Sequence, residues 1–219
     1  MKKILTSIAC LLIVAAASAQ SEKYTKAMQA AIANLDSLHT AEAWTDAANT
    51  FQRIADAEKT QWLPYYYAAL GNVMSGLMSS GVSGAAPTPD KIDPLADKAQ
   101  ELISKAAALT KENSEIYCVK KMIATTRMMA DPMNRYMTYG PQAAEALQKA
   151  KALNPENPRV YLLEGQDKFY TPEQFGGSKT EAKALFEQSL KKYDSYKPET
   201  DIHPQWGKSQ VLYFLGQLK

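Results

Sequence analysis

Few side chains in this sequence have the types and spacing that catalysis or metal binding requires. His39 and His203 are the two histidines, and neither is followed four residues later by a second metal-ligating side chain. Asp201 precedes His203 by two residues, which would suit half of a general-base dyad. Pro204 follows directly, however, and a proline at this position is typical of the start of a helix. We therefore favour a helix-capping turn over a catalytic pair.

Two further segments have some of the features of reactive sites. Residues 176–180 read Gly-Gly-Ser-Lys-Thr, but a phosphate-binding loop needs Gly-Lys-Ser/Thr, and here Ser178 separates the glycine from the lysine. A glycine turn followed by a Ser178–Glu181 capping box is the better interpretation. Cys118 has no histidine nearby in sequence that would activate a thiol, so we expect a buried structural cysteine. The sequence therefore predicts no enzyme, no metal site and no cofactor.

The N-terminus has the pattern of an export signal. Lys2 and Lys3 precede an apolar run over residues 4–17, and Ala17-Ser18-Ala19 matches a small-x-small cleavage site. The run is too short for a membrane span, and Cys10 lies inside it, whereas a lipoprotein cysteine would end it. We predict a signal peptide over residues 1–19, cleavage after Ala19, and a periplasmic mature chain of residues 20–219.

The charge of the mature chain excludes some partner classes. The whole chain has 25 basic and 23 acidic side chains, and removing Lys2 and Lys3 leaves 23 of each. Nucleic acids and anionic membranes favour a clustered basic excess, so we expect neither as a partner. No long apolar run follows residue 19, so we expect no membrane span in the mature chain.

The hydrophobic periodicity indicates an all-α protein with one domain over residues 20–219. Apolar residues recur at spacings of three and four, and alternating β-branched runs are absent. Prolines at first helical positions (Pro94, Pro158, Pro204) and the caps Asn113 and Ser178 mark helix starts. The predicted helices, about nine in number, cover 22–37, 40–58, 62–80, 93–110, 113–130, 141–153, 158–170, 178–194 and 204–218. We predict loops over 79–93, 131–140 and 170–177.

Every second predicted helix carries the same short pattern. A small residue is followed four positions later by a large apolar residue, and three further on by a small or apolar one. The four copies are Ala47-Phe51-Ile54, Ala99-Ile103-Ala106, Ala143-Leu147-Ala150 and Ala182-Phe186-Ser189. Short side chains let two helices approach closely, so this recurrence predicts helix pairs that stack on one another. A generic helical bundle with alanine-rich seams is the alternative.

This pattern resembles the second helix of the tetratricopeptide repeat. Residues 143–165 match best, because Pro155 and Gly165 fall at the family's proline and glycine positions. The resemblance implies a right-handed superhelical stack of antiparallel helix pairs, a TPR-like α-solenoid. Successive pattern alanines are 52, 44 and 39 residues apart, however, whereas the family repeats every 34 or so. The repeats are therefore degenerate.

The resemblance also implies where a ligand would bind. In tetratricopeptide proteins the first helices of the pairs line a concave groove, which here places Cys118 beside the binding set. We predict the binding residues Leu63, Tyr66, Leu70, Met122, Thr125, Arg159, Leu162, Gln166 and Phe169. This set is mostly apolar, so an extended apolar or helical segment of a partner would suit it.

Two other groups of side chains are candidates for contact surfaces. Three consecutive tyrosines, Tyr65 to Tyr67, cannot all face one side of a helix, so we expect at least one at a surface, with packing between helices as an equal alternative for the run. A methionine-rich stretch follows, for which we favour core packing over an adaptable contact surface. It comprises Met122, Met128, Met129, Met133 and Met137.

The sequence therefore predicts an exported scaffold or adaptor that binds a protein or peptide in the cell envelope. The first alternative is a helical protein that binds a small ligand or serves a transporter. The Pro-x-x-Phe-Gly-Gly run at 172–177 resembles the T component of certain solute transporters. A deep pocket among the predicted groove helices would favour this alternative, and an open groove would favour the adaptor. An enzyme of unknown class is the second alternative.

Overall fold

The structure is a computed structural model that describes residues 22–79 and 88–219, and every regular element in these ranges is helical. The predicted signal peptide lies outside them. A first helix covers residues 22–32. The other α-helices are α2 (Ala41–Ala57), α3 (Trp62–Ser79), α4 (Pro89–Ala108), α5 (Ser114–Met129), α6 (Pro132–Leu153), α7 (Pro158–Tyr170), α8 (Lys179–Ser195) and α9 (Lys208–Gln217). Short 3-10 helices cover Leu35–Ser37 and Glu173–Phe175. The prediction of an all-α protein is confirmed.

The described helices do not include one that is both long and apolar enough to cross a bilayer.

Polar side chains cap the helices that position the middle of the molecule. Asn113 accepts a hydrogen bond from the backbone N–H of Ile116 at the start of α5, and Ser178 accepts one from Glu181 at the start of α8. Each cap satisfies a backbone donor that the first helical turn leaves without a partner. Both caps were predicted and both are confirmed.

Three predicted helix starts are wrong. α4 begins at Pro89 and α6 at Pro132, so that Pro94 and Pro141 lie inside helices. An internal proline removes one backbone hydrogen bond, but tertiary contact can stabilise the helix around it. Here Arg135 in the first turns of α6 donates two hydrogen bonds to Asp93 in the first turns of α4, at 2.6 and 2.8 Å. The loop predicted over 131–140 is therefore helical from Pro132 onward, and so are residues 89–93 of the loop predicted over 79–93, of which residues 80–87 lie outside the described ranges.

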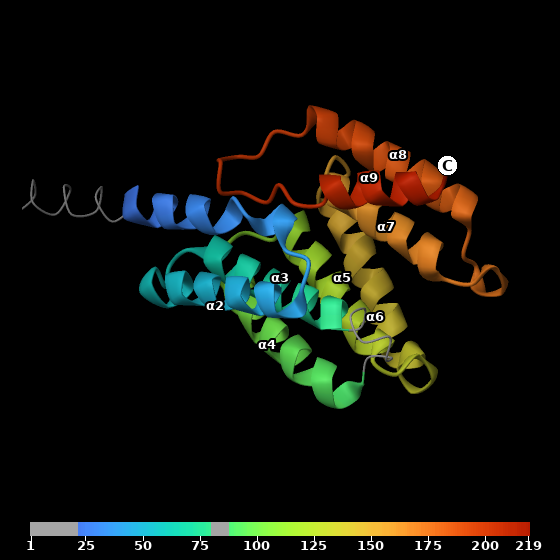
Figure 1. Cartoon of the computed structure of the whole chain (residues 1–219), viewed down its shortest axis with the longest axis horizontal. Helices are drawn as coiled ribbons and strands as arrows, with labels where there is room; N and C mark the ends of the chain where they lie inside the picture. Colours follow the sequence, from blue (N-terminus) through green and yellow to red (C-terminus); the bar gives the residue numbers. More distant parts are fainter. Residues whose placement is uncertain (1–21, 80–87) are drawn as a thin grey trace, which may run out of the picture.

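The third wrong start is that of α9, which begins at Lys208 and not at Pro204. The residues before it form an irregular segment, because three tyrosine hydroxyls donate hydrogen bonds to its backbone carbonyl oxygens. Tyr67 donates to Ile202, Tyr196 to Pro204, and Tyr193 to Trp206. We call residues 196–206 the C-terminal strap. It crosses from α8 toward the first helix before the chain returns as α9 (Figure 1).

Helices that follow one another in sequence pack together as hairpins (Figure 1). α3 contacts α2, α4 and α5, and α5 also contacts α6 and α7. α3 is therefore enclosed, and Tyr65, Tyr66 and Tyr67 are all buried. The expectation that one of these tyrosines lines a surface is wrong, because neighbours cover α3 on several sides.

Short side chains lie where the helices come closest. Ala99, Ala143 and Ala182 of the repeated pattern are buried. Gly71 of α3 faces α2 so tightly that a Cβ atom there would lie 2.8 Å from the Cβ of Ala48. Gly165 of α7 faces the ring of Phe186 in the same way. The expectation that small residues permit close helix contacts is therefore confirmed at these positions.

Candidate functional site

Most of the predicted groove residues lie in the protein interior. Thr125, Gln166 and Phe169 are half-buried. The other six are buried: Leu63, Tyr66, Leu70, Met122, Arg159 and Leu162. The structure therefore corrects the expectation of an open groove along α3, α5 and α7. Trp206 of the C-terminal strap covers Tyr66 and Arg159, and the helices packed around α3 enclose its other residues.

A buried ion pair lies beneath the strap. The guanidinium of Arg159 donates to Glu115 from Nε at 2.8 Å and from Nη2 at 2.5 Å, and it is fully buried. Tyr196 and Trp206 of the strap stack on it, with ring centroids 4.7 and 5.7 Å away. The Trp206 indole N–H donates to the Tyr66 hydroxyl at 2.8 Å, and this hydroxyl donates to Glu115. These contacts show that Tyr66 and Arg159 hold the strap in place.

Cys118 is enclosed next to this ion pair. Its thiol is fully buried, and burial raises the pKa of Cys118 above its ordinary value. The thiol is therefore protonated and inaccessible, which is the opposite of what a catalytic cysteine needs. The prediction of a buried structural cysteine is confirmed.

We expect Cys118 to resist thiol reagents in the folded mature chain, which lacks Cys10. Ellman's reagent should react only as fast as the protein unfolds, because the thiolate forms only after exposure. The rate should rise with urea in parallel with unfolding measured by circular dichroism. Rapid labelling in native buffer would contradict the burial of this thiol.

The remaining candidates for chemistry have structural partners. His203 contacts Thr200 through Nδ1 at 2.8 Å and Glu199 through Nε2 at 3.2 Å, and its ring meets that of Trp62 edge-on, with centroids 5.8 Å apart. The described residues contain no group of three or more His, Cys, Asp or Glu side chains arranged for a metal ion.

The stretch 176–180 has a structural role. Gly176 adopts a positive φ of 91°, and Ser178 caps α8. The predicted turn is present, but only half of the predicted capping box forms, because the Ser178 N–H donates to the Lys168 carbonyl and the Glu181 carboxylate pairs with Lys168.

The methionine-rich stretch divides between the interior and the surface. Met122 is buried, whereas Met133 and Met137 on the first turns of α6 are 93% and 81% exposed. Tyr136 lies between these two and is also exposed. Core packing therefore accounts for Met122 only.

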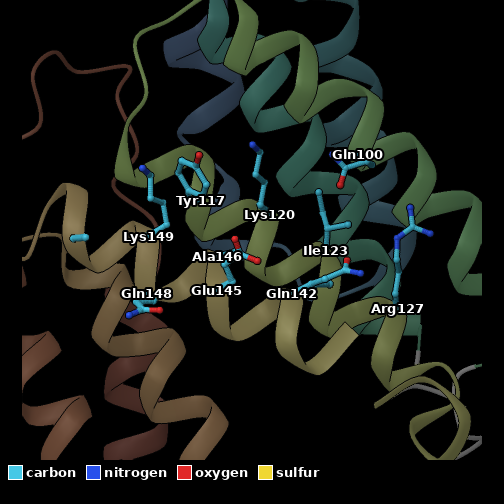
Figure 2. A pocket seen from close by; sticks show the side chains of 12 residues that line it. Gln100, Tyr117, Lys120, Ile123, Arg127, Gln142, Glu145, Ala146, Gln148 and Lys149 are labelled. Carbon is cyan, nitrogen blue, oxygen red and sulfur yellow. The ribbon is translucent and has the colours of Figure 1, made fainter. Parts of the chain in front are cut away.

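A hollow of about 640 Å³ lies over one face of α5, between α4 and α6 (Figure 2). We call it the α5 trough. It is lined by Gln100 of α4, by Tyr117, Lys120, Ile123, Ala124 and Arg127 of α5, and by Gln142, Glu145, Ala146, Gln148, Lys149 and Ala152 of α6. A smaller hollow of about 200 Å³ shares Tyr117 and Lys120 with it. The two together make a depression along one face of α5.

The trough uses a face of α5 that sequence reasoning did not select. Tyr117, Lys120, Ala124 and Arg127 follow one another at spacings of three and four, so they share one helical face. The predicted groove used Met122, which lies on the opposite, buried side. Residue type does not distinguish the two faces, because Lys121 is buried against Asp167 whereas Ile123 and Ala124 line the trough. The sequence therefore held no local signal for the open face.

Apolar side chains form the base of the trough, and charged ones surround it. Ile123, Ala124 and Ala146 are buried or nearly so. At one end, the Arg127 guanidinium lies 2.6 Å from the Asp97 carboxylate. The trough therefore offers an apolar surface bordered by three basic side chains and one acidic side chain, Glu145.

Tyr117, at the other end, brings two lysines together. The ammonium groups of Lys120 and Lys149 lie 4.7 and 5.9 Å from the centre of its ring. The Tyr117 hydroxyl donates to Glu112 at 2.5 Å, and this hydrogen bond, followed by one from Lys149, holds the pKa of Glu112 below its usual value. Glu112 therefore stays a carboxylate that fixes the orientation of the tyrosine ring.

Comparison with known proteins identifies a relative over nearly the full length. No family model and no curated protein match the sequence. Among solved structures, the chain is similar to the HusA haemophore from Porphyromonas gingivalis, with 33% sequence identity and a TM-score of 0.77. The alignment covers 90% of this chain and 92% of the haemophore. A shared helical fold and this identity over both chains show that the protein belongs to the family of the HusA haemophore.

Proposed function

We propose that this protein is an exported carrier of haem or a closely related tetrapyrrole, which it binds in the α5 trough. The observation that carries the proposal is the similarity to a haemophore over nine-tenths of both chains. The small-ligand alternative drawn from the sequence is thereby favoured over the protein adaptor. The proposed site is the α5 trough, and not the groove that the resemblance to tetratricopeptide proteins implied.

The trough has a size that suits such a ligand, and its lining is mixed, with five apolar or aromatic residues and seven polar or charged ones. Ligand pockets are typically about 300–1,000 Å³ and combine apolar contact surface with polar groups that set orientation. The trough is about 640 Å³, with Ile123, Ala124 and Ala146 at its base and Tyr117 as an aromatic surface. A tetrapyrrole is flat and apolar on both faces and carries carboxylates, which the surrounding lysines complement. Apolar contact would supply affinity, and the charges would supply orientation.

A role in binding a protein partner is the second candidate, and one surface favours it. Met133, Tyr136 and Met137 are exposed together on the first turns of α6. Exposed apolar groups of this kind often mark interaction sites. A carrier also has to meet the protein that accepts its ligand, so the two functions are compatible.

We also propose that the helix hairpins form a degenerate tetratricopeptide-like solenoid. The buried alanines of the repeated pattern and the close contacts at Gly71 and Gly165 support the proposal. Export to the periplasm is proposed on the leader pattern of residues 1–19 and on the similarity to a haemophore. The absence of enzymatic activity stays a prediction.

Titration of the mature chain with haemin tests the proposed function. We expect the Soret band to shift and tryptophan fluorescence to fall, both saturating at one haemin per chain. The physical reason is that the α5 trough has a size that accommodates one ligand. A spectrum identical to that of haemin in buffer, at every protein concentration, would contradict the proposal.

A bulky label tests the position of the site. Gln142 lines the trough and Ala144 does not, although both are exposed residues of α6. Each would be changed to Cys and modified with a bulky maleimide, while native Cys118 stays protected by burial. We expect the label at position 142 to weaken haemin binding at least about tenfold, and the label at 144 to leave it unchanged. Equal affinities in the two labelled proteins would exclude the trough.

A further inference from the structure

We propose that Lys120 and Lys149, gathered on the ring of Tyr117, bind the carboxylate edge of the ligand and so fix its orientation in the α5 trough. The inference rests on the proposed function and adds the chemistry of recognition. The ligand class is a flat macrocycle that carries its carboxylates on one edge. Lys120 and Lys149 thereby become residues that determine specificity.

The first observation is that two like charges converge. Lys120 extends from α5 and Lys149 from α6, and both lie toward the Tyr117 end of the trough (Figure 2). Their ammonium groups are 4.7 and 5.9 Å from the same ring centre. In this view the two ammonium groups lie on either side of the ring. A carboxylate placed at this end of the trough would therefore have a basic group on each side.

The second observation is that Lys120 has no carboxylate partner of its own. Glu112 lies 3.2 Å from the Lys149 ammonium and also accepts the hydrogen bond from Tyr117. Within residues 22–79 and 88–219, Lys120 forms no salt bridge, and its ammonium group lies over the Tyr117 ring. Glu145 also lines the trough near Tyr117, but no salt bridge joins it to Lys120 in these ranges, so the Lys120 ammonium is available to a ligand carboxylate.

The third observation is the difference between the two ends of the trough. Arg127, at the far end, is already paired with Asp97 at 2.6 Å, and its guanidinium also lies 5.9 Å from the Tyr139 ring centre. The two ends are ten residues apart on α5, which corresponds to about 15 Å along the helix. The ligand carboxylates therefore face Tyr117, and the apolar edge of the macrocycle lies over Ile123 and points toward Arg127.

Two ligands and four variants test the inference. The ligands are haemin and haemin dimethyl ester, in which both carboxylates are esterified. The variants are Lys120→Gln, Lys149→Gln, the double variant, and Lys183→Gln as a control. Lys183 is an exposed lysine of α8 and does not line the trough. Each combination of protein and ligand is measured by Soret titration in one buffer, at low and at high salt concentration.

We expect each single substitution to weaken haemin binding about threefold to tenfold, and the double substitution about tenfold to a hundredfold. Binding of the dimethyl ester should be the same in the wild-type protein and in all variants. High salt should weaken binding of haemin to the wild-type protein more than binding of the ester, because only haemin has free carboxylates that can pair with the lysines. The Lys183→Gln protein should match the wild type throughout.

Two results would overturn the inference alone. One is a double variant that binds haemin as tightly as the wild type, and the other is an equal loss for haemin and its ester. The failure of the wild-type protein to bind haemin at all would instead overturn the proposed function, and this inference with it. The two failures are therefore distinguishable in one set of titrations.

Discussion

Replacing Glu115 with Ala is expected to lower the free energy of unfolding by about 3–5 kcal/mol, because it leaves a buried guanidinium without its counter-charge. Arg159 is fully buried, and Glu115 accepts both of its hydrogen bonds at this site. Glu115 also accepts hydrogen bonds from Tyr66 and from Asn157. The substitution would therefore weaken the contacts that hold α3, α7 and the C-terminal strap together.

Urea denaturation followed by circular dichroism measures this effect. Glu101→Ala is the control, because Glu101 is a half-exposed α4 residue that pairs with Lys105 and Lys98, and its loss should cost at most about 1 kcal/mol. The double variant Glu115→Leu, Arg159→Met should be more stable than Glu115→Ala, since it removes both charges. If Glu115→Ala and Glu101→Ala unfold at the same urea concentration, the ion pair does not hold these elements together.

Replacing Phe186 with Ala is expected to lower the free energy of unfolding by about 3–5 kcal/mol. The Phe186 ring is fully buried and stacks on Phe214 of α9 with ring centroids 4.8 Å apart and planes 7° from parallel. It also contacts Phe169 of α7. Its removal would leave a cavity between three helices, and rigid helices close such a cavity only in part. Thermal unfolding and urea denaturation both measure the loss.

A double-mutant cycle with Gly165 tests the geometry of this contact. A Cβ atom at Gly165 would lie 2.6 Å from Cε1 of Phe186, so Gly165→Ala alone should cost about 1–3 kcal/mol through overpacking. In the Phe186→Ala background, Gly165→Ala should leave the free energy of unfolding unchanged or raise it, since the added methyl group enters the cavity and alanine favours the helix. Additive effects of the two substitutions would show that the Gly165 backbone does not pack on the Phe186 ring.

The sequence determined the local structure and the places of closest helix contact. The caps Asn113 and Ser178 each accept a hydrogen bond from a backbone N–H only three residues later. The small residues Ala99 and Ala182 are buried where one helix packs on another. Such interactions depend on side chains whose spacing is visible in the sequence. The starts of α4 and α6 were missed because a contact between distant residues, Asp93 and Arg135, stabilises them.

Only the tertiary structure decided which face of α5 is open. Both faces carry large side chains, so periodicity alone did not distinguish a groove from a core. The C-terminal strap covers Tyr66 and Arg159, some 140 and 47 residues before Trp206 in the chain, and so closes the groove that was expected. Burial is a property of everything that surrounds a side chain, and the residues that cover α5 come from parts of the sequence that no local pattern connects.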